Sequence, residues 1–110
     1  MAFLFACHLN DLSENKIQKL VVDDLNVLVV KTSDNRVWCF DYFCTHADKS
    51  LEKGRWDAEG QTIMCPFHKA VFSLKDAGKV LTGPACIPLK VYPTEIRQSS
   101  NGPHLFVELD

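Results

Sequence analysis

The chain has 110 residues, of which 46% are apolar, and it carries a formal net charge of -2 at neutral pH. That length allows one domain with a modest core and leaves no room for a second catalytic domain. Acidic and basic residues are interspersed, so the sequence contains no basic stripe of the kind that predicts nucleic-acid binding.

Short runs of β-forming residues predict an antiparallel all-β fold. Four runs fill the first part of the chain, at 3–7, 16–22, 27–32 and 37–40, and the turn residues at 33–35 predict a hairpin between the last two. Further along, 54–56 and 62–64 predict a second hairpin, and 72–74 lead into a turn at 75–78. Strands at 90–97 and 105–109 close the chain, with 98–103 between them. No stretch has the period of an amphipathic helix, although local turns are expected near 12–15 and 47–53.

The five cysteines indicate a reducing compartment. Cys7, Cys39 and Cys86 lie at scattered positions inside apolar runs, which predicts buried thiols used for packing rather than a disulfide framework. The apolar run at 2–7 is too short for a secretory signal and has no basic residues before it. Nothing approaches the length of a membrane span, so we expect a cytoplasmic protein without membrane contact.

Two short words offer a set of metal ligands. Cys44 and His46 form a Cys-x-His word, and eighteen residues separate it from the Cys-x-x-His word of Cys65 and His68. Two thiolates and two imidazoles suit either tetrahedral zinc or a [2Fe-2S] cluster with mixed ligation. Common zinc frameworks pair like ligands within a word, whereas each word here mixes sulfur with nitrogen. The mixing counts against the common zinc frameworks, and both a cluster and a zinc-stabilised interaction module stay open at this point.

These words, followed by a Gly-Pro-Ala turn at 83–85, resemble the Rieske iron-sulfur family over about residues 3–109. The likeness is greatest to the small ferredoxins of bacterial ring-hydroxylating oxygenases. It implies a single domain, 1–110, in which an antiparallel β-sandwich or barrel base carries a small cluster-binding subdomain at about 42–84. It also implies that Cys44, His46, Cys65 and His68 bind one [2Fe-2S] cluster, with sulfur on one iron and nitrogen on the other. The gap between the words is slightly long for such ferredoxins, with 56–60 as an extended hairpin turn.

The resemblance implies an electron carrier and not an enzyme. Its partners would be an NAD(P)H-dependent flavin reductase and a terminal Rieske non-haem iron oxygenase that hydroxylates aromatic rings in hydrocarbon catabolism, with the carrier as a monomer. The remaining histidines, His8 and His104, lie at opposite ends of the chain and are interpreted as packing or surface residues. No G-x-G-x-x-G fingerprint indicates a nucleotide fold. The alternative within the family is the small Rieske-like subunit of an NAD(P)H nitrite reductase.

The residues around the ligand words predict a low reduction potential. High-potential Rieske proteins have an extra cysteine in each loop, which this chain lacks, and present a serine and a tyrosine where Ala70 and Phe72 stand here. Fewer hydrogen bonds to the cluster sulfurs destabilise the reduced state, which predicts a potential of roughly -150 mV. Phe67, Phe72 and Pro84 are expected either to shield the sulfur side of the cluster or simply to pack.

Overall fold

The computed structural model describes residues 2–45, 49–67, 69–83 and 87–109. Within these ranges the chain forms one short 3-10 turn, η1 (Leu9–Asp11), and eleven strands, which confirms the expected all-β class. None of the described helical segments is long and apolar enough to cross a membrane. The strands are β1 (Phe3–His8), β2 (Gln18–Val22), β3 (Leu25–Lys31), β4 (Val37–Asp41), β5 (Arg55–Asp57), β6 (Thr62–Met64), β7 (Val71–Ser73), β8 (Lys79–Thr82), β9 (Val91–Tyr92), β10 (Thr94–Ser99) and β11 (Gly102–Glu108).

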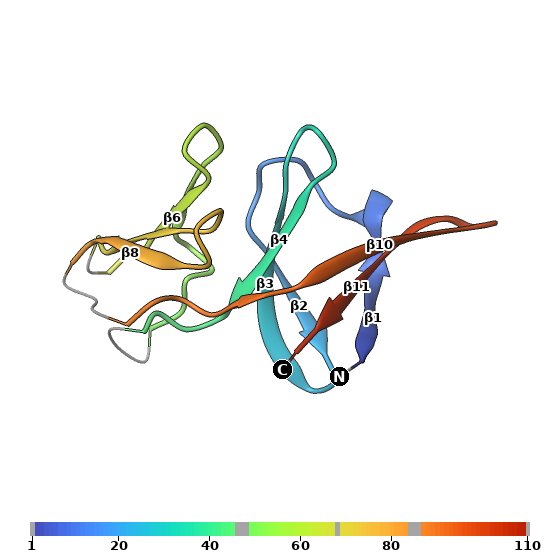
Figure 1. Ribbon diagram of the computed structural model, residues 1–110, viewed down its shortest axis with the longest axis horizontal. Helices are drawn as coiled ribbons and strands as arrows, with labels where there is room; N and C mark the ends of the chain where they lie inside the picture. Colours follow the sequence, from blue (N-terminus) through green and yellow to red (C-terminus); the bar gives the residue numbers. More distant parts are fainter. Residues whose placement is uncertain (1, 46–48, 68, 84–86, 110) are drawn as a thin grey trace.

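The strands form three antiparallel sheets. Their orders are β1-β11-β10, β2-β3-β4-β9 and β5-β6-β7-β8. We call the first two sheets the base and the third the small sheet. In Figure 1 the small sheet, marked by β6 and β8, lies at one end of the molecule, and the strands of the base occupy the other end. The chain leaves the base after β4, forms the small sheet, and returns at β9, which pairs with β4.

Strand β3 lies between two cores. Successive side chains of a strand point to opposite faces of its sheet. Val27 and Val29 therefore pack with residues of β11 in the base core, whereas Leu28 and Val30 face the small sheet. All four side chains are fully buried. We call the second cluster the junction core; its buried members are Leu28, Val30, Phe40, Cys44, Leu51, Ile63, Cys65, Ala70, Phe72, Leu74 and Leu89.

The predicted hairpin between β3 and β4 is present. Thr32 donates its backbone N–H to the carbonyl of Arg36 over 2.8 Å, and its hydroxyl donates to the carboxylate of Asp34. Asn35 has a φ of 64°, a left-handed conformation that asparagine tolerates better than most residues. The turn residues at 33–35 thus form the connection that the sequence predicts. The hairpin expected from 54–56 and 62–64 is also confirmed as β5 and β6.

The second half of the chain differs from the prediction in three places. The single strand expected at 90–97 is divided at Pro93 into β9, which pairs with β4, and β10, which pairs with β11. Proline has no N–H for a sheet ladder, so the chain changes sheets there. Strand β11 begins at Gly102, earlier than predicted, and Pro103 fits into it because β1 pairs with β11 only as far as His104. Strand β8 was not predicted at all.

Candidate metal centre

Cys44 and Cys65 lie in one core although twenty positions of sequence separate them. Cys44 follows β4 and Cys65 follows β6 directly. Their exposed fractions are 4% and 0%, and both are members of the junction core. A buried thiolate is costly unless a positive centre compensates its charge. Cys44 and Cys65 share one cluster, so a single metal centre would compensate both charges, whereas the buried Cys39 lies in the other core.

The two ligand words form loops that close in the same way. The backbone N–H of Cys44 donates to the carbonyl of Lys49, and that of Cys65 donates to the carbonyl of Ala70, each over 2.8 Å. In both cases the acceptor lies five positions after the cysteine. The second loop has a further bond, from the N–H of Lys69 to the carbonyl of Cys65 over 3.0 Å, with a φ of 60° at Lys69. The Cys-x-His and Cys-x-x-His motifs differ in the spacing of their ligands, but the two loops that contain them have the same length.

A third segment is linked to the first loop. The hydroxyl of Thr45 donates to the carbonyl of Ile87 over 2.7 Å. Ile87 lies shortly after the predicted Gly-Pro-Ala turn, of which Gly83 is exposed. Pro84 and Ala85 lie outside the described residues. The bond brings the segment after this turn to the first ligand loop, where a covering loop is expected.

His46 and His68 lie outside the described residues, as does Cys86. The four-residue ligand set therefore stays a prediction, of which the structure places the two cysteines. Phe72, expected to shield or pack, is fully buried in the junction core. Phe67 is 57% exposed, and the Lys49 ammonium lies 5.3 Å from the centre of its ring. Phe67 is therefore not a core residue.

Comparison with known proteins gives the family to which this site belongs. The family model of the Rieske [2Fe-2S] domain matches residues 2–93, a range that includes both ligand words and the turn after β8. The chain belongs to the Rieske [2Fe-2S] domain family. Its cofactor is accordingly a single [2Fe-2S] cluster, and the donors at hand fit it, because such clusters use two cysteines and two histidines.

Individual relatives of this Rieske chain are components of dioxygenases. The 3-phenylpropionate/cinnamic acid dioxygenase ferredoxin subunit of Photorhabdus laumondii is 30% identical over 100 residues, which cover 91% of each chain. The ferredoxin of carbazole 1,9a-dioxygenase from Nocardioides aromaticivorans has a TM-score of 0.82 at 24% identity, with both chains fully covered. A ferredoxin solved in complex with the oxygenase of carbazole 1,9a-dioxygenase has a TM-score of 0.77 at 27% identity, covering 96% of this chain and 100% of that one.

A nitrite reductase subunit shares the fold. The structure described as the putative NADH-dependent nitrite reductase small subunit of Mycobacterium tuberculosis has a TM-score of 0.77. It is 20% identical and covers 99% of this Rieske chain and 96% of its own. At this identity the likeness concerns the fold alone, whereas the dioxygenase ferredoxin of Photorhabdus is similar in sequence as well.

The other described cysteines of the Rieske chain are packing residues, as predicted. Cys7 and Cys39 are free thiols, and both belong to or pack against the base core rather than the junction core. Burial raises the pKa of the Cys39 thiol to about 12, and the nearby Cys7 and Asp41 add to the effect. Burial, with Asp11, raises the pKa of Cys7 to about 11. Both thiols therefore stay protonated at neutral pH, and both lie in the base away from the ligand loops.

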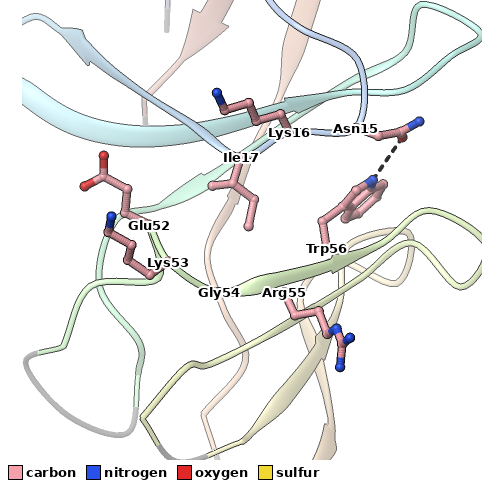
Figure 2. Close-up of a pocket in the computed structure, with 8 residues that line it drawn as sticks. All are labelled: Asn15, Lys16, Ile17, Glu52, Lys53, Gly54, Arg55 and Trp56. Atoms are coloured by element: carbon pink, nitrogen blue, oxygen red, sulfur yellow. Dashed lines mark hydrogen bonds between the residues drawn. The ribbon is translucent and has the colours of Figure 1, made fainter.

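A polar pocket lies where the small sheet meets the base. It has a volume of about 520 Å³ and is lined by residues 15–17 and 52–56. Figure 2 shows the indole of Trp56 directed at Asn15, and the Trp56 Nε1–H donates to the Asn15 Oδ1 over 3.1 Å. Asn15 has a φ of 54°. This bond connects the start of the small sheet to the segment before β2 and so helps to hold the ligand loops against the base.

We expect the bond between Trp56 and Asn15 to contribute about 0.5–1.5 kcal/mol to the free energy of unfolding, as a typical hydrogen bond does. Asn15→Gly removes the acceptor oxygen, and the glycine that replaces Asn15 also tolerates the left-handed backbone at this position. Asn15→Gly should therefore lower the free energy of unfolding more in the wild-type background than in the Trp56→Phe background. Urea denaturation of the four proteins of this double-mutant cycle measures the difference. Equal costs in the two backgrounds would show that the bond contributes nothing.

The absence of a hydroxyl at Ala70 leads to a prediction about the potential. Ala70 is fully buried, and its carbonyl accepts the Cys65 N–H, so the hydroxyl introduced by Ala70→Ser would lie next to a predicted cluster ligand. One added hydrogen bond to the reduced cluster should raise the midpoint potential of Ala70→Ser by roughly 20–65 mV. Protein-film voltammetry measures the change. Ala58→Ser, an exposed change in the turn between β5 and β6, is the control and should leave the potential unchanged; a lowered potential in Ala70→Ser would contradict the argument.

Proposed function

We propose that this chain is the ferredoxin component of a dioxygenase that hydroxylates aromatic rings. It takes single electrons from a flavin-dependent NAD(P)H reductase and delivers them to a terminal Rieske non-haem iron oxygenase. The cluster, when bound, supplies a centre that cycles between two states differing by one electron. The ligands in this proposal are Cys44 and Cys65 on one iron and His46 and His68 on the other. The carrier acts in the cytoplasm as a monomer.

The observation that carries the proposal is the pair of matching loops. They bring two buried thiols from separate parts of the chain into the junction core, in a chain whose family binds this cluster. The second loop carries the exposed ring of Phe67, and the ammonium of Lys49, at the end of the first loop, lies beside that ring. An exposed aromatic ring on a ligand loop is suited to contact with a partner protein, because aromatic residues are enriched in protein interfaces. The names of the similar ferredoxins support the dioxygenase system in particular.

Most of the chain serves to hold the ligand loops in place. Leu51 and Ile63 are fully buried in the junction core next to the two cysteines. The N–H of Leu51 donates to the carbonyl of Tyr42, and the carbonyl of Leu51 accepts the N–H of Gly54, each over 2.8 Å. These bonds fix the return of the first loop into β5. A rigid frame of this kind suits electron transfer, because the protein needs to change little between its two redox states.

The direct test is electron delivery by the purified protein. Reduced with dithionite and freed of excess reductant, it should lose its electron on anaerobic mixing with the oxidised oxygenase of a 3-phenylpropionate or carbazole dioxygenase. One electron should be transferred per chain, followed by visible absorbance in a stopped-flow instrument. The same mixture with reductase, NADH, oxygen and substrate should form the cis-dihydroxylated or hydroxylated product. A protein that holds its cluster but reduces neither oxygenase would contradict the partner assignment.

The nitrite reductase assignment is the second candidate, and it rests on the shared fold. In that case the chain would be a fixed subunit and would copurify with a large sirohaem-containing subunit. In the proposed function it purifies alone. Size-exclusion chromatography of the natively expressed protein separates the two outcomes, because a free chain of 12.4 kDa elutes far from such an assembly.

A further inference from the structure

Two histidines that the sequence places at opposite ends of the chain are neighbours in the structure. His8 at the end of β1 is directly opposite His104 of β11 in the register of the sheet. The centres of their rings are 4.4 Å apart, and the ring planes are perpendicular. Both lie on the β1-β11-β10 sheet of the base. This sheet packs on the base core, whereas the cysteines of the ligand loops lie in the junction core.

An irregularity in β1 brings His8 to this position. Phe5 is opposite Phe106, and His8 is opposite His104, so three positions of β1 match two positions of β11. The extra residue is a β-bulge between Phe5 and Cys7. Without it, strict alternation would place Phe5 and His8 on opposite faces. With it, both rings contact His104 at centre distances of 5.6 and 4.4 Å.

This face is open to solvent. Leu105 and Val107, the alternate residues of β11, are fully buried in the base core, so His104 and Phe106 point outward. His8 is exposed, and among the described residues its imidazole makes ring contacts but no hydrogen bond or ion pair. The His104 Nε2 lies 3.4 Å from the Ser99 hydroxyl, which is a long and weak hydrogen bond. Both imidazoles are therefore able to rotate about their side-chain bonds and exchange their present contacts for a ligand.

We propose that His8 and His104 together bind one divalent transition-metal ion of the late first row, such as Ni²⁺, Cu²⁺ or Zn²⁺. Neutral imidazole is the commonest protein ligand for these ions. Two imidazoles that share an ion at about 2.1 Å have ring centres about 4.5–5 Å apart, close to the spacing of this pair. Water would complete the coordination, since the described residues contain no group of three or more His, Cys, Asp or Glu placed to hold a metal ion.

The charged side chain of Arg97, beside His104 in the sheet, is already engaged elsewhere. Arg97 is opposite His104 in the register, on the other side from His8. Its guanidinium lies 4.1 Å from the centre of the Phe106 ring and pairs with the Glu95 carboxylate, with Nε to Oε2 at 2.5 Å. This pairing offsets the positive charge that would otherwise repel an incoming cation. Bound metal would connect β1 to β11 and so hold the N-terminal strand to the sheet.

The test uses the full chain with its cluster and Ni²⁺ as the probe, measured by isothermal titration calorimetry above the pKa of free imidazole. We expect one Ni²⁺ per chain at this site. His8→Gln and His104→Gln should each weaken it at least about tenfold, because a chelate of two linked ligands is lost. Ser99→Ala, which alters the neighbour of His104 but removes no imidazole, should bind within about twofold of the wild type. The wild type and the three single variants share any Ni²⁺ binding by the histidines of the ligand loops. The double variant His8→Gln/His104→Gln measures this background binding alone.

A second measurement separates a chelate from an effect on folding. Ni²⁺ should raise the melting temperature of the wild type in a concentration-dependent way, because it binds the folded state. At the same Ni²⁺ concentration the melting temperature of each single variant should rise clearly less than that of the wild type, and far-UV circular dichroism should show all of them folded. Ni²⁺ affinity and thermal shift that are the same in the wild type and the double variant would overturn the proposal. Since this site is apart from the ligand loops, that result would leave the electron-carrier function untouched.

Discussion

Cys65→Ser is expected to purify with little iron and little acid-labile sulfide, and without the red-brown colour of a Rieske protein. Iron–sulfur clusters are held by thiolates, and a serine hydroxyl is not deprotonated at neutral pH. Cys65 is fully buried at the start of the second loop, so a ligand from solvent cannot easily take its place. Because cluster binding is coupled to folding, the variant should also be less stable than the wild type. Iron and sulfide per chain, together with the EPR spectrum of the reduced protein, measure the loss.

Two cysteine variants serve as controls for this experiment. Cys7→Ser changes a half-buried thiol of the base and should keep its full iron content, with a stability cost of about 1 kcal/mol. Cys86→Ser should also keep the cluster, because Cys86 is not in the predicted ligand set. Iron lost from Cys86→Ser, or retained in Cys65→Ser, would show that the ligands had been wrongly assigned.

Gly78→Ala should be the most damaging of the conservative substitutions. Gly78 lies in the turn between β7 and β8 with a φ of 81°, a conformation that strains other residues. A Cβ built there would lie 1.8 Å from the carbonyl oxygen of Leu89, which is a backbone atom and cannot rotate away. The carbonyl of Gly78 also accepts the N–H of Leu89 over 2.9 Å. Strain and overpacking together should lower the free energy of unfolding by about 2–5 kcal/mol.

Urea denaturation measures this effect as a midpoint lowered by about 1 M or more. The matched control is Gly83→Ala. Gly83 is exposed, and a Cβ built there meets nothing within 4 Å, so its midpoint should stay close to that of the wild type. Gly78→Ala should also disturb the cluster environment, because the segment held by Gly78 includes Ile87, the acceptor of the Thr45 hydroxyl. A Gly78→Ala protein as stable as Gly83→Ala would mean that the turn relaxes without cost.

Local patterns in the sequence were enough to predict most of the strands. The runs of β-forming residues at 27–32 and 37–40 and the turn residues at 33–35 correctly predicted the β3–β4 hairpin, because the hydrogen bonds that join the two strands and close the turn are local. The break at Pro93 was missed, since the residues on both sides have equal β-forming tendency and only the sheet partners differ. Strand β8 was missed because its stability comes from pairing with β7 and not from its own four residues.

The candidate site was predicted in part for the same reason. The spacing of the two words indicated the ligands, but it gave no sign that both loops close five positions after the cysteine. It also could not show that both thiols share the junction core, which depends on contacts between distant segments. His8 and His104 were interpreted separately, each as a packing or surface residue. A β-bulge and a pairing of the two chain ends create it, and neither has a local signal.

The ladder between β4 and β9 has a consequence for how such carriers diversify. It pairs Cys39 with Tyr92 and Phe40 with Val91, and everything between these strands departs from and rejoins the base at that one place. The stretch between β4 and β9, residues 42–90, is thus an insertion that is joined to the base through one pair of strands. Such an insertion can be exchanged between related proteins as long as the β4–β9 pair and the apolar face of the base that packs against the insertion are kept compatible with it. Redox properties and the remaining surface of the protein are then free to change independently of each other.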